Sequence, residues 1–283
     1  MAAFGLSRMI LGFEGPSVES MPRTDVPPKI EGRDPAPEGS RLLVGVDGGE
    51  GGRDALELGR VLGSIQGAIG TAATVPTRGP DRGGSPAQVL LERAEREGVK
   101  SLIVGSPHRG PIGRALIGNV TKGVLHGAPC EVAVAPHGYA AVHHDPYRAI
   151  AVAYDGTPEA KAALRRAESL ALLTNATIEV LTVGSPPAAM PGPGVYVSSQ
   201  PPEADKILNE AIHSVDPALG ARGRRLDGDP ATMLARACED RVDLLVAGSR
   251  GYGPVARVLF GSVTARLVQD PPCPVLVVPR HPG

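Results

Sequence analysis

The sequence predicts two tandem α/β domains, each a doubly wound, Rossmann-like parallel sheet, with the first domain truncated. Three observations predict this. Short apolar runs such as Ser101–Val104 and Asp243–Ala247 alternate with segments whose apolar residues recur at helical spacing. Residues 102–136 align without gaps on residues 245–279. A chain of 283 residues is also long enough for two domains of ordinary size.

The internal repeat defines the two domains. Between residues 102–136 and 245–279 the offset is a constant 143 residues, and the identical residues of the first copy include Gly105, Ser106, Gly110, Pro111, Gly118, Val120, Thr121, Cys130 and Pro136. Between Asp47 and Asp155, which follow the first strand of each copy, the offset is only 108 residues. The first copy therefore lacks about 35 residues, which correspond to the second helix and third strand of the second copy.

The first domain is expected over residues 41–136, after a flexible, proline-containing tail over residues 1–40. Its expected elements, in order, are a strand over 41–47, a helix over 53–62, a strand over 68–75, a helix from Ser85-Pro86 and a strand over 101–104. Ser85 suits a helix N-cap and Pro86 the first helical position, so the start of this helix is well defined.

The second domain is expected over residues 149–283, after a solvated linker over residues 137–148. Its expected elements, in order, are a strand over 149–154, a helix from Thr157-Pro158, a strand over 177–183, a helix over 203–215, a strand over 221–226, a helix from Asp229-Pro230, a strand over 243–247, a helix over 263–269 and a final strand over 275–278. Adjacent histidines, His143 and His144, lie in the linker, and we expect no metal site there.

Composition argues against several classes of protein. The chain has 29 basic and 30 acidic residues, only 3% aromatic residues and no tryptophan, so it offers neither a basic field nor a base-stacking surface for nucleic acid. It has no apolar run of about 18 residues, and residues 1–40 lack the features of a signal peptide. We therefore expect a cytoplasmic protein that binds neither nucleic acid nor membranes.

The three cysteines, Cys130, Cys238 and Cys273, form no Cys-x-x-Cys pair and have no histidine at zinc-finger spacing. Cys130 and Cys273 occupy matching positions just before the last strand of each copy. We interpret them as small buried residues, with a redox sensor as the alternative.

The most distinctive stretch is the loop that begins at Gly248, where an apolar strand ends. Gly248 and Gly251 lack a Cβ and can adopt positive φ, so the backbone can turn sharply and approach a ligand closely. Gly261-Ser262 then opens an amphipathic helix, whose first N–H groups have no intrahelical partners and attract anions. This combination favours a phosphate group.

The spacing Gly-x2-Gly-x9-Gly-Ser, followed by the apolar strand at residues 274–278, strongly resembles the nucleotide-binding universal stress protein family. The resemblance implies that ATP, with Mg²⁺, binds to the second copy. Asp155 and Val183 would meet the adenine end. The ribose and phosphates would be bound by Ala247, Gly248, Arg250, Gly251, Gly261, Ser262, Val263 and Thr264.

Each of these residues also has a local interpretation. Asp155 could end a strand in an Asp-Gly turn, Arg250 could be a surface charge, and Ser262 with Thr264 could simply begin a helix. The first copy is not expected to bind nucleotide in this way, because Pro107 and His108 interrupt its loop and Asn119 follows Gly118 in place of serine.

The resemblance further implies that the last strands, Glu131–Ala135 and Pro274–Val278, pair with each other inside the chain. A homodimer and unidentified protein partners are also possible. The leading hypothesis is a regulatory ATP-binding sensor of the stress response without catalytic residues. The alternatives are a slow Mg²⁺-dependent ATPase and a scaffold that binds no nucleotide. Residues 251–256 also fit a dinucleotide fingerprint, but Pro254 interrupts it.

Overall fold

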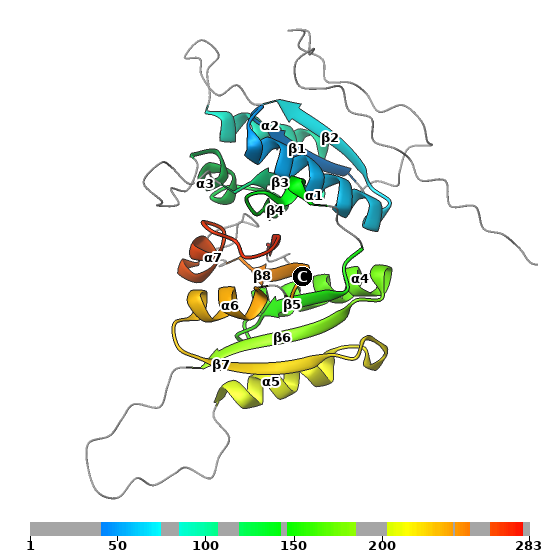
Figure 1. Ribbon diagram of the computed structural model, residues 1–283, viewed down its shortest axis with the longest axis vertical. Coiled ribbons are helices and arrows are strands. Elements are labelled where there is room, and N and C mark those ends of the chain that lie inside the picture. Colours follow the sequence, from blue (N-terminus) through cyan, green and yellow to red (C-terminus); the bar gives the residue numbers. More distant parts are fainter. Residues whose placement is uncertain are drawn as a thin grey trace, which may run out of the picture.

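The structure, a computed structural model, describes residues 41–74, 85–106, 119–142, 146–184, 203–239, 241–249 and 261–279. In these residues, helices cover both faces of one largely parallel sheet (Figure 1). The predicted α/β fold class is therefore confirmed. The expected tail, residues 1–40, and the histidine pair at 143–144 lie outside the described residues.

The first half of the chain, defined here as the part from β1 to β4, begins directly at the expected strand. Its elements are β1 (Arg41–Val46), α1 (Glu50–Gln66), β2 (Ile69–Thr74), α2 (Pro86–Glu97), β3 (Ser101–Gly105), α3 (Asn119–Leu125) and β4 (Glu131–Ala135), followed by the short turn η2 (Tyr139–Ala141). Helix α2 begins where the sequence predicts. The Ser85 hydroxyl accepts a hydrogen bond from the Gln88 N–H, and the Gln88 side chain accepts one from the Ser85 N–H.

The second half, from β5 to β9, has two more regular elements. Its elements are β5 (Ala149–Ala153), α4 (Pro158–Thr174), β6 (Thr177–Gly184), α5 (Glu203–Ser214), η3 (Pro217–Leu219), β7 (Arg222–Asp227), α6 (Pro230–Cys238), β8 (Leu244–Gly248), α7 (Ser262–Leu267) and β9 (Val275–Val278). Thr157 and Asp229 cap α4 and α6, each followed by proline. Helix α5 and strand β7 have no counterpart in the described first half, in agreement with the difference in offset.

The two halves share one nine-stranded sheet in the order β2-β1-β3-β4-β9-β8-β5-β6-β7. Within each half every strand pair is parallel. Between them, β4 and β9 are antiparallel, with Ala133 opposite Leu276. The strands of the halves therefore run in opposite directions, and their carboxyl ends lie on opposite edges of the sheet.

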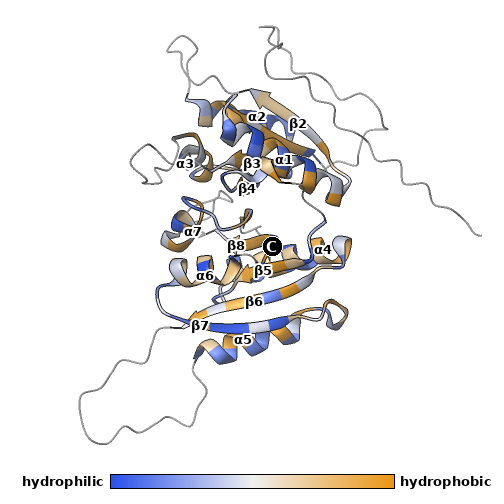
Figure 2. Ribbon diagram, viewed as in Figure 1, coloured by the Kyte–Doolittle hydropathy of each residue, from blue (hydrophilic) through white to orange (hydrophobic). Residues whose placement is uncertain are grey.

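The core lies on both faces of this sheet. Helices α1, α4 and α5 bury one face, while α2, α3, α6 and α7 bury the other. In β9, Val275 and Val277 belong to the second cluster and Leu276 and Val278 to the first, because side chains alternate along a strand. Figure 2 shows the central strands β5 and β8 as hydrophobic, whereas the edge strand β7 is largely hydrophilic. None of the described helices has both the length and the apolar surface to cross a bilayer.

All three cysteines are free and buried in this core. Burial raises the pKa of the Cys130 thiol to about 12. The pKa of Cys273 is raised by a hydrogen bond with Cys238 and by burial. A thiol held in its neutral form is a poor nucleophile, so these observations favour the interpretation as small core residues.

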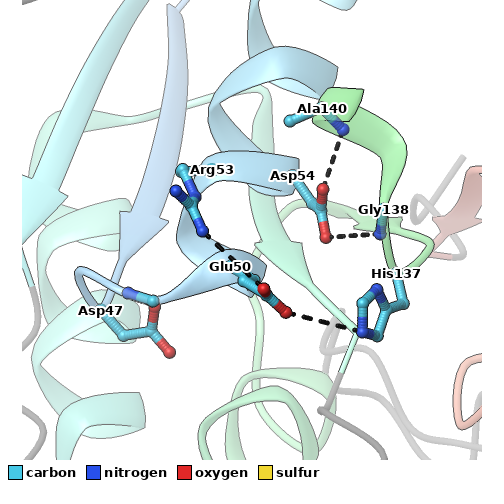
Figure 3. A network of polar contacts seen from close by, with 8 residues as sticks. Asp47, Glu50, Arg53, Asp54, His137, Gly138 and Ala140 are labelled. Carbon is cyan, nitrogen blue, oxygen red and sulfur yellow. Dashed lines mark hydrogen bonds and ion pairs between the residues drawn. The ribbon is translucent and has the colours of Figure 1, made fainter. Parts of the chain in front are cut away.

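The linker between the halves is bound near both ends by aspartate carboxylates, one buried in α1 and the other exposed just before β8. Asp54 of α1 is 4% exposed and accepts hydrogen bonds from the N–H groups of Gly138 (3.0 Å) and Ala140 (2.8 Å), as Figure 3 shows. At the other end, the Asp243 carboxylate accepts hydrogen bonds from the N–H groups of Arg148 (2.7 Å) and Ala149 (2.9 Å). Two aspartates thus hold the described residues near each end of this linker.

A buried ion pair joins the halves beside the β4–β9 junction. Arg166 of α4 is 8% exposed, and its Nε lies 2.6 Å from Glu131 Oε1 of β4, in an ion-pair contact without hydrogen-bond alignment. Its Nη2 donates to Gln66 Oε1 of α1 at 2.7 Å, and the Ser101 hydroxyl donates to Glu131 Oε2 at 3.1 Å. Two opposite charges from different halves are therefore neutralised inside the molecule.

Removing one charge of this pair should destabilise the protein. We expect Glu131→Gln to lower the free energy of unfolding by about 3 kcal/mol, because it leaves the Arg166 guanidinium buried without a counterion. Urea titration followed by circular dichroism measures the change. The same substitution at the more exposed helical pair, Glu97→Gln opposite Arg93, should cost about 0.5 kcal/mol or less. Equal decreases in the free energy of unfolding for the two variants would contradict a buried, stabilising contact between Arg166 and Glu131.

Stability should also fall at alkaline pH. Burial raises the pKa of Cys130, Tyr139 and Tyr147, so the native state keeps protons that the unfolded chain loses above about pH 9. The free energy of unfolding then decreases as pH rises from about 9 towards 12, by up to about 1.4 kcal/mol per pH unit for each group. Urea titrations at pH 8 and pH 10.5 test this, and identical midpoints would refute it.

Candidate functional site

A pocket of about 530 Å³ opens at the carboxyl ends of β5, β6 and β8. Its position follows from the topology. From β5 the chain extends the sheet through β6 and β7 on one side, then crosses to β8 and β9 on the other side. The connections therefore diverge between β5 and β8, and such a switch point leaves a crevice outside the strand ends.

The structure brings most of the residues implied by the sequence resemblance to this pocket. Those that line it are Asp155, Val183, Ala247, Gly248, Gly261, Val263 and Thr264. Ser262, the first residue of α7, is exposed and does not line it. Arg250 and Gly251 lie outside the described residues, as do Pro107 and His108 in the corresponding loop of the first half.

The pocket has an apolar part and a polar part. The apolar part is formed from β5, β6 and α6, by Ala153, Leu181, Val183, Pro230 and Leu234. The polar part is formed by the loop after β5, the start of α4, the end of β8 and the start of α7, and it contains Asp155, Thr157, Glu159, Ser249 and Thr264. A ligand with a flat apolar end and a polar end suits this arrangement.

Asp155 combines a place in the pocket wall with a local structural role. Its Oδ1 accepts hydrogen bonds from the Thr157 N–H (3.1 Å) and the Thr157 hydroxyl (2.6 Å). In the first half, Asp47 Oδ1 accepts one from the Gly49 N–H (2.9 Å). Because both halves use the aspartate in this way, the turn explains its presence in each. The location of Asp155 in the pocket is the additional feature of the second half.

Gly248 allows β8 to lie directly against the first turn of α4. A Cβ at this position would come within 2.7 Å of the carbonyl carbon and oxygen of Glu159, closer than any side chain tolerates. In the first half, a Cβ added at Gly105 would lie even closer to the carbonyl of Gly51. The glycines are therefore required by close backbone packing, which also shapes the floor of the pocket.

Thr264 has a role that the sequence did not indicate. Its hydroxyl donates to the Gly248 carbonyl at 3.4 Å, and the equivalent Thr121 hydroxyl donates to the Gly105 carbonyl at 3.0 Å. The shared bond connects the helix start to the end of the preceding strand in both halves. The Thr264 hydroxyl therefore supports the wall of the pocket, and it already donates its hydrogen bond to another group of the protein.

Ser249 is a lining residue that the sequence reasoning treated only as a spacer in the glycine motif. Its side chain is buried, with 1% exposure, and its hydroxyl has no hydrogen-bond partner among the described residues. The sequence signal that could have identified it is its repetition as Ser106 directly after Gly105.

An ion pair joins the two helices that border the pocket. Arg266 of α7 donates from Nη1 to Asp229 Oδ2 at 2.8 Å, and from Nη2 to the Thr232 hydroxyl of α6 at 3.3 Å. The hydrogen bond from Arg266 is the main cause that lowers the pKa of Asp229 to about 2. The Asp229 carboxylate therefore stays ionised at neutral pH, and the pair links the start of α6 to the last turn of α7.

Comparison with known proteins agrees with this geometry. The family model described as "Universal stress protein family" matches residues 71–136 and 146–279, which together make up more than half of the chain. The chain belongs to the universal stress protein family. The matched segments lie one in each half, so the family relationship extends to both.

Several universal stress proteins align with large parts of this family member. One from Mycolicibacterium smegmatis is 27% identical over 197 residues, which cover 69% of this chain and 66% of the relative. One from Thermus aquaticus is 31% identical over 140 residues, covering 47% of this chain and 98% of the relative. The crystal structure of a universal stress protein from Archaeoglobus fulgidus has a TM-score of 0.63 at 18% identity, covering 86% of this chain and all of that one. This structural likeness shows the fold.

The contact of Gly248 with α4 can be tested by adding one methyl group. We expect Gly248→Ala to lower the free energy of unfolding by about 1–3 kcal/mol, because the Cβ would overlap the Glu159 carbonyl and force the backbone apart. Thermal denaturation followed by circular dichroism measures this. Gly70→Ala in β2 is the control, since a Cβ there has no neighbour within 4 Å. A Gly248→Ala variant as stable as Gly70→Ala would contradict the close packing.

Proposed function

We propose that this universal stress protein binds an adenine nucleotide, ATP with Mg²⁺, in the second-half pocket, and that nucleotide occupancy regulates its partners in the stress response. The observation that supports this most directly is the convergence of residues distant in the sequence. Asp155, Val183, Gly248 and Gly261 come from separate elements, yet all line one pocket at the topological switch point.

The two parts of the pocket suit the two ends of the ligand. The apolar side chains of β5, β6 and α6 can bury the base, while the polar part faces the ribose and phosphates. Gly248 and Gly261 let a phosphate approach the backbone, and the first N–H groups of a helix lack intrahelical partners. The volume of about 530 Å³ is in the range of small-molecule sites.

Mg²⁺ fits the charges of the pocket. Asp155 and Glu159 are the acidic residues of the described lining, and they would repel a triphosphate without a cation. Mg²⁺ typically binds one or two carboxylates together with phosphate oxygens and neutralises their charge. Because Asp155 would meet the adenine end, Glu159 at the start of α4 is the carboxylate of the described lining that would hold the ion beside the phosphates.

Binding without rapid turnover is the favoured form of the function. The described lining contains no histidine, lysine or cysteine, and Asp155 is already bonded to Thr157. A slow Mg²⁺-dependent ATPase is the enzyme alternative, and a nucleotide-free scaffold is the other. Measuring phosphate release over hours with and without Mg²⁺ separates the ATPase from simple binding.

Isothermal titration calorimetry with Mg-ATP tests the proposal. We expect a stoichiometry near one per chain, because in the first half Pro107 and His108 interrupt the glycine loop and Asn119 replaces the serine of the motif. Asp155→Ala should weaken binding about tenfold or more, whereas Asp47→Ala, its equivalent in the first half, should leave the affinity unchanged. Folded protein, free of co-purified nucleotide, that shows no heat of binding would refute the nucleotide function and favour the scaffold.

A further inference from the structure

We propose that the Ser249 hydroxyl donates a hydrogen bond to an oxygen of the bound nucleotide, so that the ligand supplies the partner that the protein alone does not provide. The inference rests on the proposed function and adds a residue to it. It concerns a side chain that the glycine motif leaves unspecified and that the sequence reasoning did not include.

The position of Ser249 is fixed by bonds on both sides. Its N–H donates to the Val278 carbonyl of β9 at 2.9 Å. The preceding residue, Gly248, lies against the first turn of α4, and its carbonyl accepts the Thr264 hydroxyl. The backbone at Ser249 is therefore held by β9, α4 and α7 at the wall of the pocket. A rigid backbone with a donor at the pocket is a preorganised contact.

The energetics of the hydroxyl indicate a ligand. Burying a hydroxyl without a partner destabilises a protein, and buried polar groups are for this reason nearly always hydrogen-bonded. Ser249 is 1% exposed. Alanine lacks only the hydroxyl oxygen of serine, so it would avoid the cost of burying an unsatisfied hydroxyl at this position. A residue that opposes stability at the wall of a pocket is typical of a functional site.

Thr182 provides a comparison within the same molecule. It is 3% exposed, and its hydroxyl also lacks a partner among the described residues. Its neighbours on β6, Leu181 and Val183, line the pocket, but Thr182 does not, because successive side chains of a strand point to opposite faces. The two residues therefore share the unsatisfied hydroxyl, but only Ser249 belongs to the wall of the pocket.

The proposal predicts opposite effects of one substitution on the free and bound protein. Without nucleotide, Ser249→Ala should raise the melting temperature by roughly 2–4 °C, because an unsatisfied hydroxyl is removed. With nucleotide, the same variant should raise the Kd for Mg-ATP about tenfold, because a hydrogen bond is lost. The stability gain alone would show only an unsatisfied hydroxyl, as at Thr182, and the weakened Kd identifies the contact with the ligand.

The experiment combines thermal denaturation of the nucleotide-free protein with calorimetric titration of Mg-ATP for four full-length proteins. These are the wild type, Ser249→Ala, Thr182→Val and Ser106→Ala. Thr182→Val should raise the melting temperature of the free protein without changing the Kd. Ser106→Ala, at the equivalent position of the first half, should also leave the Kd unchanged.

The outcomes separate this inference from the proposed function. If the wild type binds no Mg-ATP, both are overturned. If the wild type binds and Ser249→Ala binds equally well, only the Ser249 contact is overturned. If Ser249→Ala melts several degrees lower than the wild type, the hydroxyl has a structural partner and the contact is likewise refuted. A higher melting temperature together with a weakened Kd supports it.

Discussion

The antiparallel pairing of β4 with β9 determines how the rest of the molecule is arranged. Each half on its own would end in an apolar strand with unpaired backbone groups, and such an edge is unfavourable in water. Their pairing covers both strands at once and makes a single continuous sheet. The buried contact between Arg166 and Glu131 lies next to this junction and links a helix of one half to a strand of the other.

The repeat separates structural from functional residues. Bonds that occur in both halves, such as those of Asp47 and Asp155 to the following turn, belong to the shared scaffold. The same holds for the threonine bonds to Gly105 and Gly248. Positions that differ between the halves show what is special to the second half. Glu159 lines the pocket at a position that corresponds to Gly51, which is packed tightly against β3.

The sequence predicted the elements well because their signals are local. The serine or threonine caps followed by proline define helix starts, and the change of offset located the missing helix and strand. The sequence did not reveal the contacts that depend on the packed fold. Asp54 and Glu131 are ordinary acidic residues in the sequence, yet both are buried and bind partners far along the chain. Likewise, the resemblance identified Thr264 but not its bond to Gly248, which requires strand and helix to be in place.

The bound linker has a consequence for the way the two halves stay together. Only residues 136–148 separate β4 from β5, and Asp54 and Asp243 bind this short stretch near its two ends. A short connection gives each half a high effective concentration near the other. Two separate chains joined through the same strands would come apart on dilution, whereas the pairing within one chain does not depend on protein concentration. The integrity of the sheet is therefore independent of how much of the protein a cell makes.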